Sequence, residues 1–467
     1  GLVDKVLFAS ISAESSARIA QFAAQNLSNL AWACAKIAYQ DFRLLNAIAA
    51  EAIPKLEQFK PQELSNTVWA FGKLGFRKEG FMEAFASEAL KKLRLFAPQD
   101  LCAAAWAYAT LSDQDHPELL AGIAEAALGL IAEFNSQDLA NTAWASATLS
   151  YQNEAVLKSQ CNAMLTKLDN FAPEGLATTA WALSSMDVRD QRLMAALGAE
   201  ALKKLSDIEA QSLGILADSQ IPCSDSFLAA LQPHMDYFLQ CLPTSMQECV
   251  AGDFLRKLQQ LKIDNFGARG ARSVLKAMGV PSPAVAFNEE AVQWICRKIE
   301  EDGGEKRGRE AKDACTGAAL VHRRVFAYAD YDIEVDTMDG PSLTLRGSMV
   351  KENGRRERDS SGEPPIPSLC PPPSCFVPVV SPISALVDRT LCSEYQVLSA
   401  IAEEAAQKGA RAGRVQGKVR LFVSTAPCIS CLTVMRQFQL RFPLLSVEVG
   451  NGEETHISSA TFHDGKK

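Results

Sequence analysis

The hydrophobic positions in the first half of the chain recur every 37 to 38 residues, a period that five of the six tryptophans mark. These are Trp32, Trp69, Trp106, Trp144 and Trp181. Each lies in an apolar stretch with helical spacing, followed by a turn and a second amphipathic stretch such as residues 79–92. A sixth copy has Asp218 in place of the tryptophan. The pattern predicts about six pairs of helices with an atypical last copy.

Neither helix of such a pair can bury its apolar face alone, so we expect consecutive pairs to stack. Stacking builds an α-solenoid with one continuous core, here over residues 1–222. The tryptophans either belong to that core or offer flat faces to nucleobases, and their apolar neighbours favour the core.

Beyond residue 222 the helical pattern continues but the repeat is lost. Pro and Gly interrupt residues 223–320, which we expect to connect two domains and to include one amphipathic helix over residues 287–314. The period of the hydrophobic positions then changes to two, as in β-strands. Four segments are predicted strands: residues 323–335, 342–350, 419–425 and 444–449.

A segment rich in charge and proline separates the second and third predicted strands. Its composition predicts an exposed, disordered insertion at about residues 351–380. The chain is therefore predicted to be multidomain, with an α-solenoid at residues 1–222, a helical connection at residues 223–320 and a domain of strands and helices at residues 321–467.

Two helices predicted in the C-terminal domain begin beside cysteines. Thr390 or Ser393 can cap the first helix, which places Cys392 and Glu394 at its first turn. Because residues two apart on a regular helix point in different directions, Cys392 is expected at the cap itself.

Pro427 marks the start of the second helix, where Cys428 and Cys431 lie three residues apart on one face. Together with Cys392 they would present three thiolates, a ligand set that suits zinc and leaves a fourth position open for water. Glu394 would then carry protons between the attacking water, the ring and the departing ammonia, without binding the metal.

The combination of Cys-x-Glu with Pro-Cys-x-x-Cys resembles the signature of the cytidine deaminase-like superfamily. Residues 320–450 look most like the deaminase domains of bacterial polymorphic toxins and their eukaryotic relatives. The resemblance implies a three-layer α/β fold, zinc held by Cys392, Cys428 and Cys431, and Glu394 as the catalytic residue. It also implies a zinc-dependent hydrolase, with cytidine favoured over adenosine because the first ligand is a cysteine.

Three other interpretations of these motifs stay open. A strand followed by Pro-Cys-x-x-Cys also describes a thioredoxin-like redox centre. A closed structural zinc site would need a fourth ligand, for which His456 and His463 are available downstream. The domain could also be a deaminase that has lost its activity, although the presence of Glu394 argues against this.

The period and the Trp-Ala core of the repeats resemble the octotricopeptide and heptatricopeptide repeats, helical-repeat families of organelle proteins that bind RNA. The resemblance implies that polar residues on the first helix of each pair contact the bases of single-stranded RNA. The candidates lie three residues before each tryptophan: Asn29, Asn66, Asn141 and Thr178. Ala103 holds this position in the third copy and can form no hydrogen bond through its side chain.

Charge argues against tight, sequence-independent binding of nucleic acid. Residues 1–220 contain 18 basic and 25 acidic residues, a net charge of −7, and the whole chain has −8. A basic cluster before the third predicted strand could meet phosphates, although a solvated loop is the simpler interpretation. Its members are Arg411, Arg414, Lys418 and Arg420. A protein-binding scaffold is therefore the alternative to an RNA-binding array.

The cysteines, the apolar runs and the first residues of the chain bear on the cellular compartment of the protein. The 13 cysteines lie largely at apolar helix positions, which is typical of a reducing environment. No uncharged apolar run long enough for a membrane span is found. The chain opens with Gly1 inside a helical pattern, so we expect a preceding segment to be missing, and the repeats suggest a mitochondrion or plastid.

The sequence thus predicts a zinc-dependent nucleobase deaminase that edits cytidine to uridine in RNA selected by the helical repeats. One alternative is a non-enzymatic scaffold or RNA-binding protein whose zinc domain is inactive or structural, with protein partners. Another is a deaminase that acts on free nucleoside or on DNA.

Overall fold

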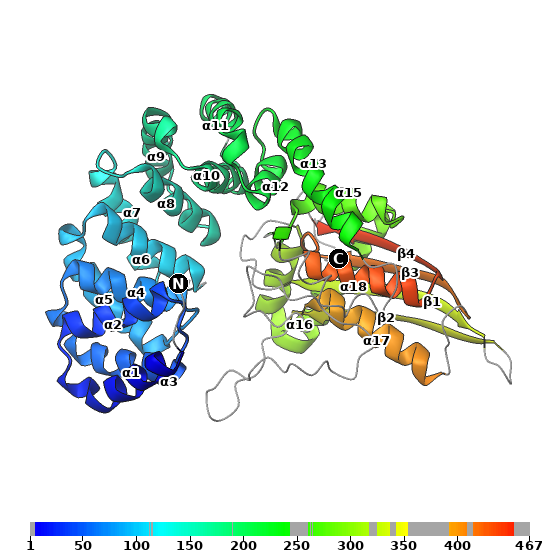
Figure 1. Cartoon of the computed structure of the whole chain (residues 1–467), viewed down its shortest axis with the longest axis horizontal. Coiled ribbons are helices and arrows are strands. Elements are labelled where there is room, and N and C mark those ends of the chain that lie inside the picture. The colour runs from blue at the N-terminus through cyan, green and yellow to red at the C-terminus, as the bar shows by residue number, and fades with distance from the viewer. Residues whose placement is uncertain are drawn as a thin grey trace, which may run out of the picture. The chain divides into compact units, whose positions relative to one another are not determined.

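A computed structural model describes six stretches of the chain, apart from the single positions 112, 114, 189, 262 and 264. The stretches are residues 5–242, 260–316, 325–336, 342–353, 392–408 and 414–452. The chain divides into two compact units (Figure 1), unit 1 with residues 1–208 and 220–222 and unit 2 with residues 209–219 and 223–467. Of the predicted insertion, residues 354–380 lie outside the described part.

Unit 1 is an α-solenoid of helical pairs, as the period predicts. After α1 (Lys5–Arg18) its helices alternate between two layers. The tryptophan-bearing first layer holds α2 (Ala24–Lys36), α4 (Pro61–Lys73), α6 (Pro98–Thr110), α8 (Ser136–Thr148) and α10 (Pro173–Ser185). The second layer holds α3 (Phe42–Ala52), α5 (Glu79–Lys92), α7 (Pro117–Leu130), α9 (Glu154–Lys167) and α11 (Gln191–Lys203). Neighbouring helices of each layer contact one another, which makes the core continuous.

The first helix of each pair begins and ends in a similar way from copy to copy. Proline occupies the first turn of α4, α6 and α10, where its missing N–H costs nothing. The carboxylates of Glu63 and Asp100 accept the N-cap backbone N–H of α4 and α6, at 2.9 and 3.1 Å. After the helix the chain turns through a residue with positive φ, and these are Ala38, Gly75, Ser150 and Asp187.

A lysine at the end of the second helix ties each copy to the preceding one. Lys92 Nζ donates to the backbone oxygens of Glu57 and Phe59, at 2.7 and 2.9 Å, and pairs with the Glu88 carboxylate at 2.9 Å. We call this contact the lysine staple. The same position holds lysines that donate to carbonyls of the preceding copy in three other places: Lys55, Lys167 and Lys204. In α7 the position is Gly129, which has no side chain to donate.

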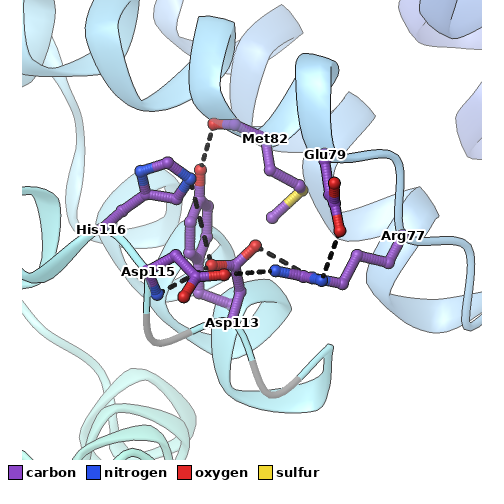
Figure 2. Close-up of polar contacts among 7 residues, drawn as sticks. Arg77, Glu79, Met82, Asp113, Asp115 and His116 are labelled. Carbon is purple, nitrogen blue, oxygen red and sulfur yellow. Dashed lines mark hydrogen bonds and ion pairs between the residues drawn. The ribbon is translucent and has the colours of Figure 1, made fainter.

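A buried carboxylate also joins the second and third copies. Figure 2 shows Asp113, in the turn after α6, facing Arg77 from the turn after α4. Arg77 Nε lies 3.2 Å from the Asp113 carboxylate, and its Nη2 lies 2.7 Å from that of Asp115. Asp113 also accepts the backbone N–H of Asp115 at 3.2 Å. Its charge is therefore buried with an opposite charge and a hydrogen-bond donor, as buried charges require.

The tryptophans lie at the margin of the core and not within it, so the expectation that they are core residues is wrong. Trp32 is 42% exposed, and the other four are half-buried. The rings of Trp69, Trp106 and Trp144 follow one another at centroid separations of 6.2 and 6.3 Å. The alanine after each tryptophan occupies the core position instead. Helices α4 and α6 cross too closely for an indole to fit there, since a Cβ added at Gly72 would lie 3.0 Å from the Cα of Ala107.

Unit 2 begins with the sixth copy of the repeat. Its helices before the sheet are α12 (Ala210–Asp218), α13 (Ser224–Cys241), α15 (Gly267–Ala277) and α16 (Val285–Thr316). Asp218, which replaces the tryptophan, accepts the backbone N–H groups of Ala268 and Arg269 at 2.5 and 3.1 Å. A Cβ at Gly267, whose φ is +74°, would lie 2.2 Å from that carboxylate, so only glycine fits. The acidic residue therefore holds the start of α15 where the array ends.

The rest of unit 2 is a three-layer α/β domain. Its strands are β1 (Phe326–Val335), β2 (Leu343–Glu352), β3 (Val415–Val423) and β4 (Leu444–Asn451). They form one sheet in the order β2-β1-β3-β4, in which β1 is antiparallel to both neighbours and β3 is parallel to β4. Its helices after the hairpin of β1 and β2 are α17 (Ser393–Gln407) and α18 (Ile429–Arg441).

Alternate residues of β1 show which helices cover which face. Tyr328 packs with Phe287 of α16, while Tyr331 points the other way and donates to Glu404 of α17 at 2.5 Å. Helices α17 and α18 contact each other and lie along the same side of the sheet (Figure 1). The residues of α16 are helical as predicted. The helix bends back on itself, which brings Gly308 against Glu300. No helix in the described part of the chain is long and apolar enough to cross a membrane.

Candidate metal centre and catalytic carboxylate

Two helix starts bring the predicted ligands together. Cys392 is the N-cap residue of α17, with the extended backbone that a cap requires, so Ser393 does not cap this helix, and Thr390 lies outside the described residues. Cys428 is likewise the N-cap residue of α18, and Pro427 precedes the cap instead of occupying the first helical turn. Because Cys392 lies outside the regular helix, its side chain is free of the angular constraint that separates residues two apart.

The sulfur atoms of Cys392, Cys428 and Cys431 all lie within 4.8 Å of one another, and we call this group the sulfur cluster. The Sγ atoms of Cys428 and Cys431 are 3.5 Å apart. Tetrahedral zinc with Zn–S bonds of about 2.3 Å separates its sulfurs by roughly 3.8 Å, so the cluster fits this ion. Among the described residues no fourth ligand joins the group, and His456 and His463 lie outside that part of the chain.

Crowding favours the neutral form of two of the three thiols. The hydrogen bond that the Cys392 thiol donates to Cys428, together with burial, keeps the pKa of Cys392 above its ordinary value. Hydrogen bonds with Cys392 and Cys428, together with burial, raise the pKa of Cys431 well above its ordinary value. Three thiolates cannot share a buried site without a positive charge among them, and a divalent cation supplies that charge. The chemistry of the donor set therefore agrees with its geometry.

Glu394 lies one residue into α17 and is only 4% exposed. Burial, and then the negative charge of Cys428, raises its pKa to about 7. The hydroxyl of Ser393 donates to its Oε2 at 3.1 Å and acts in the opposite direction. A carboxyl with a pKa near neutrality can both accept and return a proton at physiological pH.

Ser393 is a contact that the sequence did not identify. Its only signal is a small hydroxyl residue between a metal-ligand candidate and an acid, which many sequences contain by chance. The structure gives it a specific neighbour, because its fully buried side chain reaches the carboxylate of Glu394.

The candidate base-contacting residues lie where the resemblance to RNA-binding repeats puts them, on the first layer of unit 1. Asn29 is exposed, and Asn66, Asn141 and Thr178 are half-buried. Each lies one helical turn before its tryptophan and shares its face. Asn141 also forms a hydrogen bond with the thiol of Cys102 on the neighbouring helix.

Two members of the basic cluster, Lys418 and Arg420, do not lie in a loop as expected. Strand β3 begins at Val415, so Lys418 and Arg420 lie within the sheet. Lys418 pairs with Glu448 at 2.7 Å, and Arg420 pairs with Asp330 of β1. Both positive charges are therefore matched across neighbouring strands, while Arg411 lies outside the described residues.

Comparison with known families also separates the helical repeats from the C-terminal domain. The family model of an RNA-editing substrate-binding complex 6 protein matches residues 1–114 and, again, residues 107–216. A toxin-deaminase model, described as the BURPS668_1122 family of deaminases, matches residues 374–452. No curated protein matches the chain. The chain therefore joins a helical-repeat region similar to that RNA-editing complex protein to a C-terminal region similar to the toxin-deaminase family.

Proposed function

We propose that unit 2 is a zinc-dependent nucleobase deaminase, with Cys392, Cys428 and Cys431 as metal ligands. The observation that carries this proposal is the convergence of the three sulfurs beside the buried carboxylate of Glu394. A redox pair needs two thiols and gives no reason for Cys392 to join them. The match of residues 374–452 to a deaminase family supports the same chemistry.

The chain's own residues account for the proton movements of such a reaction. A bound zinc ion would supply the Lewis acidity that makes water a nucleophile near neutral pH. Glu394 takes one proton from the attacking water and delivers it to ring nitrogen N3 of cytosine, so that C4 accepts the oxygen. It then moves the proton of the new hydroxyl to the exocyclic amine, which leaves as ammonia. Ser393, hydrogen-bonded to Oε2, holds the carboxylate in place between these transfers.

We further propose that the substrate is cytidine in single-stranded RNA and that the repeats choose the site. The match of unit 1 to an RNA-editing substrate-binding complex protein supports this division of labour, as do the half-exposed amides beside the tryptophans. Single-stranded RNA also avoids the cost of extruding a base from a duplex. Because the repeats resemble families of organelle proteins, we expect the native protein in a mitochondrion or plastid, which immunolocalisation tests.

The net charge of −7 in residues 1–220 favours a second candidate, a scaffold that binds proteins and carries an inactive or structural zinc domain. A third candidate keeps the chemistry but takes free nucleoside or DNA. Crosslinking separates the first two, because an editing factor yields RNA adducts and a scaffold yields protein adducts alone.

The decisive experiment is Glu394→Gln in the full chain, assayed for base conversion in cellular RNA, single-stranded DNA and free cytidine. We expect the rate to fall roughly 10²- to 10⁴-fold while the zinc content is unchanged, because the residue moves protons and binds no metal. Glu403→Gln, on an exposed position of the same helix, serves as the matched control and should leave the rate unchanged. Equal activity of the Glu394 variant and the parent protein would end the enzyme proposal.

A further inference from the structure

The first layer of unit 1 presents a second polar column, one helical turn further from each tryptophan than the asparagines. All its residues are exposed, and they are Gln25, Gln62, Gln99, Gln137 and Glu174. Each lies four residues before the candidate base-contacting position of its copy, so the two side chains share one face of the helix. We call the two residues of a copy its reader pair. The chain has five such pairs, and the fifth, Glu174 with Thr178, differs in chemistry from the others.

The reader pairs differ in the hydrogen bonds that their side chains can accept and donate. A glutamine or asparagine amide offers one acceptor and two donors, so it can pair with the Watson–Crick edge of any base. A carboxylate only accepts hydrogen bonds, and it therefore needs two adjacent N–H donors to use both oxygens. Guanine alone among the four bases offers this arrangement, through N1–H and the exocyclic N2 amine. The Thr178 hydroxyl, one turn along the same helix, can donate to guanine O6.

We propose that the fifth copy selects guanine in single-stranded RNA, while the copies with Gln–Asn pairs accept several bases. This inference rests on the proposed RNA-binding function of the repeats and specifies its sequence preference. Among the described residues Glu174 forms no ion pair, so its carboxylate is available to a ligand. The third copy, with Gln99 and Ala103, contributes the least because one member of its pair cannot form hydrogen bonds through its side chain.

The charge distribution explains why base edges should matter more than phosphates here. Four lysines of unit 1 are committed to the lysine staple and donate to backbone carbonyls. Lys36 lies 5.2 and 5.6 Å from the ring centroids of Trp32 and Trp69, so it also has partners within the protein. Unit 1 has 18 basic and 23 acidic residues, a net charge of −5, so it has few cations left for the RNA backbone. Binding should therefore depend weakly on salt and strongly on the bases.

The test is selection from a randomised single-stranded RNA pool with the full chain and with Glu174→Gln. The parent chain should enrich guanine at one position by roughly ten- to hundredfold, the discrimination expected of a bidentate pair. Glu174→Gln should lose that preference and keep the rest of the selected sequence. Glu125→Gln removes the same charge from an exposed position of α7, in the second layer, and should select as the parent does. Ala103→Asn completes a further Gln–Asn pair with Gln99, so it should tighten binding and add no base preference.

Each result is decisive. Guanine enrichment that survives Glu174→Gln, or a parent chain that binds RNA without any guanine preference, overturns the inference and leaves RNA binding by the repeats intact. A parent chain that recovers no RNA, while the same preparation deaminates free cytidine, overturns both this inference and the proposed role of the repeats. Recovery of protein partners alone would point to the scaffold and would also overturn the inference. Because Glu174 is exposed, the substitution is not expected to affect folding.

Discussion

The repeats of unit 1 and the sulfur cluster of unit 2 arrange their functional side chains in opposite ways. Unit 1 spreads equivalent polar residues over five copies, so that in the proposed function each supplies a fraction of the binding. Unit 2 brings one carboxylate and three thiols from two helix starts to one point, with the sulfurs within 4.8 Å of one another. Removing one member should therefore weaken unit 1 by degrees and disable unit 2 outright.

The same contrast holds for the forces that stabilise the two regions. In unit 1 each copy contacts its neighbours through contacts that repeat every 37 to 38 residues, so local changes have local effects. In unit 2 the cluster depends on α17 and α18 being held on one face of a sheet whose strands come from residues 326 to 451. Substitutions that show how far a local change affects stability or activity in each unit therefore test this comparison.

The largest effect is expected from Cys431→Ser, which removes a proposed ligand that is only 1% exposed. Serine nearly preserves the shape but lacks the soft sulfur, so zinc affinity should fall more than about 100-fold and base conversion should be lost with it. Metal analysis of the purified chain measures the first and an RNA conversion assay the second. Unfolding of unit 1, followed through the fluorescence of its five tryptophans, should not change.

Cys223→Ser provides the matched control, because this thiol is exposed and lies outside the sulfur cluster. Its zinc content and activity should equal those of the parent protein. A Cys431→Ser protein that kept its zinc and its activity would show that the cluster is not the metal centre.

An intermediate effect is expected from Lys92→Met, which keeps the aliphatic stem and removes the lysine staple. The change leaves three backbone carbonyls without their donor and the buried Glu88 with Lys91 as its remaining partner, at a cost of roughly 2 kcal/mol in the free energy of unfolding of unit 1. Urea unfolding followed by tryptophan fluorescence measures this loss. Lys91→Met, which removes a well-exposed lysine bonded only to Glu88, should cost less than half as much.

The pH dependence of that loss identifies its cause. Burial tends to raise the pKa of Glu88, but hydrogen bonds from Lys92 and Lys91 outweigh it and lower the pKa. A lowered pKa in the folded state stabilises the fold at neutral pH, and this contribution disappears as the pH falls through that value. The difference in stability between the parent protein and Lys92→Met should therefore shrink below about pH 4.5. A difference that stayed constant with pH would assign the loss to the hydrogen bonds with the backbone carbonyls and to packing, and not to the ion pair with Glu88.

Sequence was a good guide where a pattern depends on local spacing. The tryptophan period predicts the helical pairs, and the spacing of Cys392, Cys428 and Cys431 predicts a metal-sized cluster. The cap of α17 was harder to predict, because cysteine is not a usual N-cap residue and no helix preference indicates its position.

Features that depend on contacts between segments far apart in the sequence could not be predicted. The tryptophans look like core residues, yet the close crossing of α4 and α6 at Ala107 leaves room only for small side chains. Asp218 looks like a degenerate tryptophan position until α15, about 50 residues later in the chain, supplies the N–H groups that it accepts. Lys418 and Arg420 look like a loop cluster because their acidic partners lie on other strands.

The smallest effect should come from adding the lysine staple to α7, which lacks it. Gly129 holds the staple position in α7, it is exposed, and a Cβ added there meets no atom within 4 Å. Gly129→Ala should stabilise unit 1 through helix propensity alone, by up to about 1 kcal/mol. Gly129→Lys should add a further 0.5 to 1 kcal/mol, roughly the net value of one intramolecular hydrogen bond, if its Nζ reaches the carbonyls of the preceding copy as Lys92 does. Urea unfolding of both variants measures the difference, and equal stabilities would mean that the staple follows from packing in its own copy and does not act as a transferable contact.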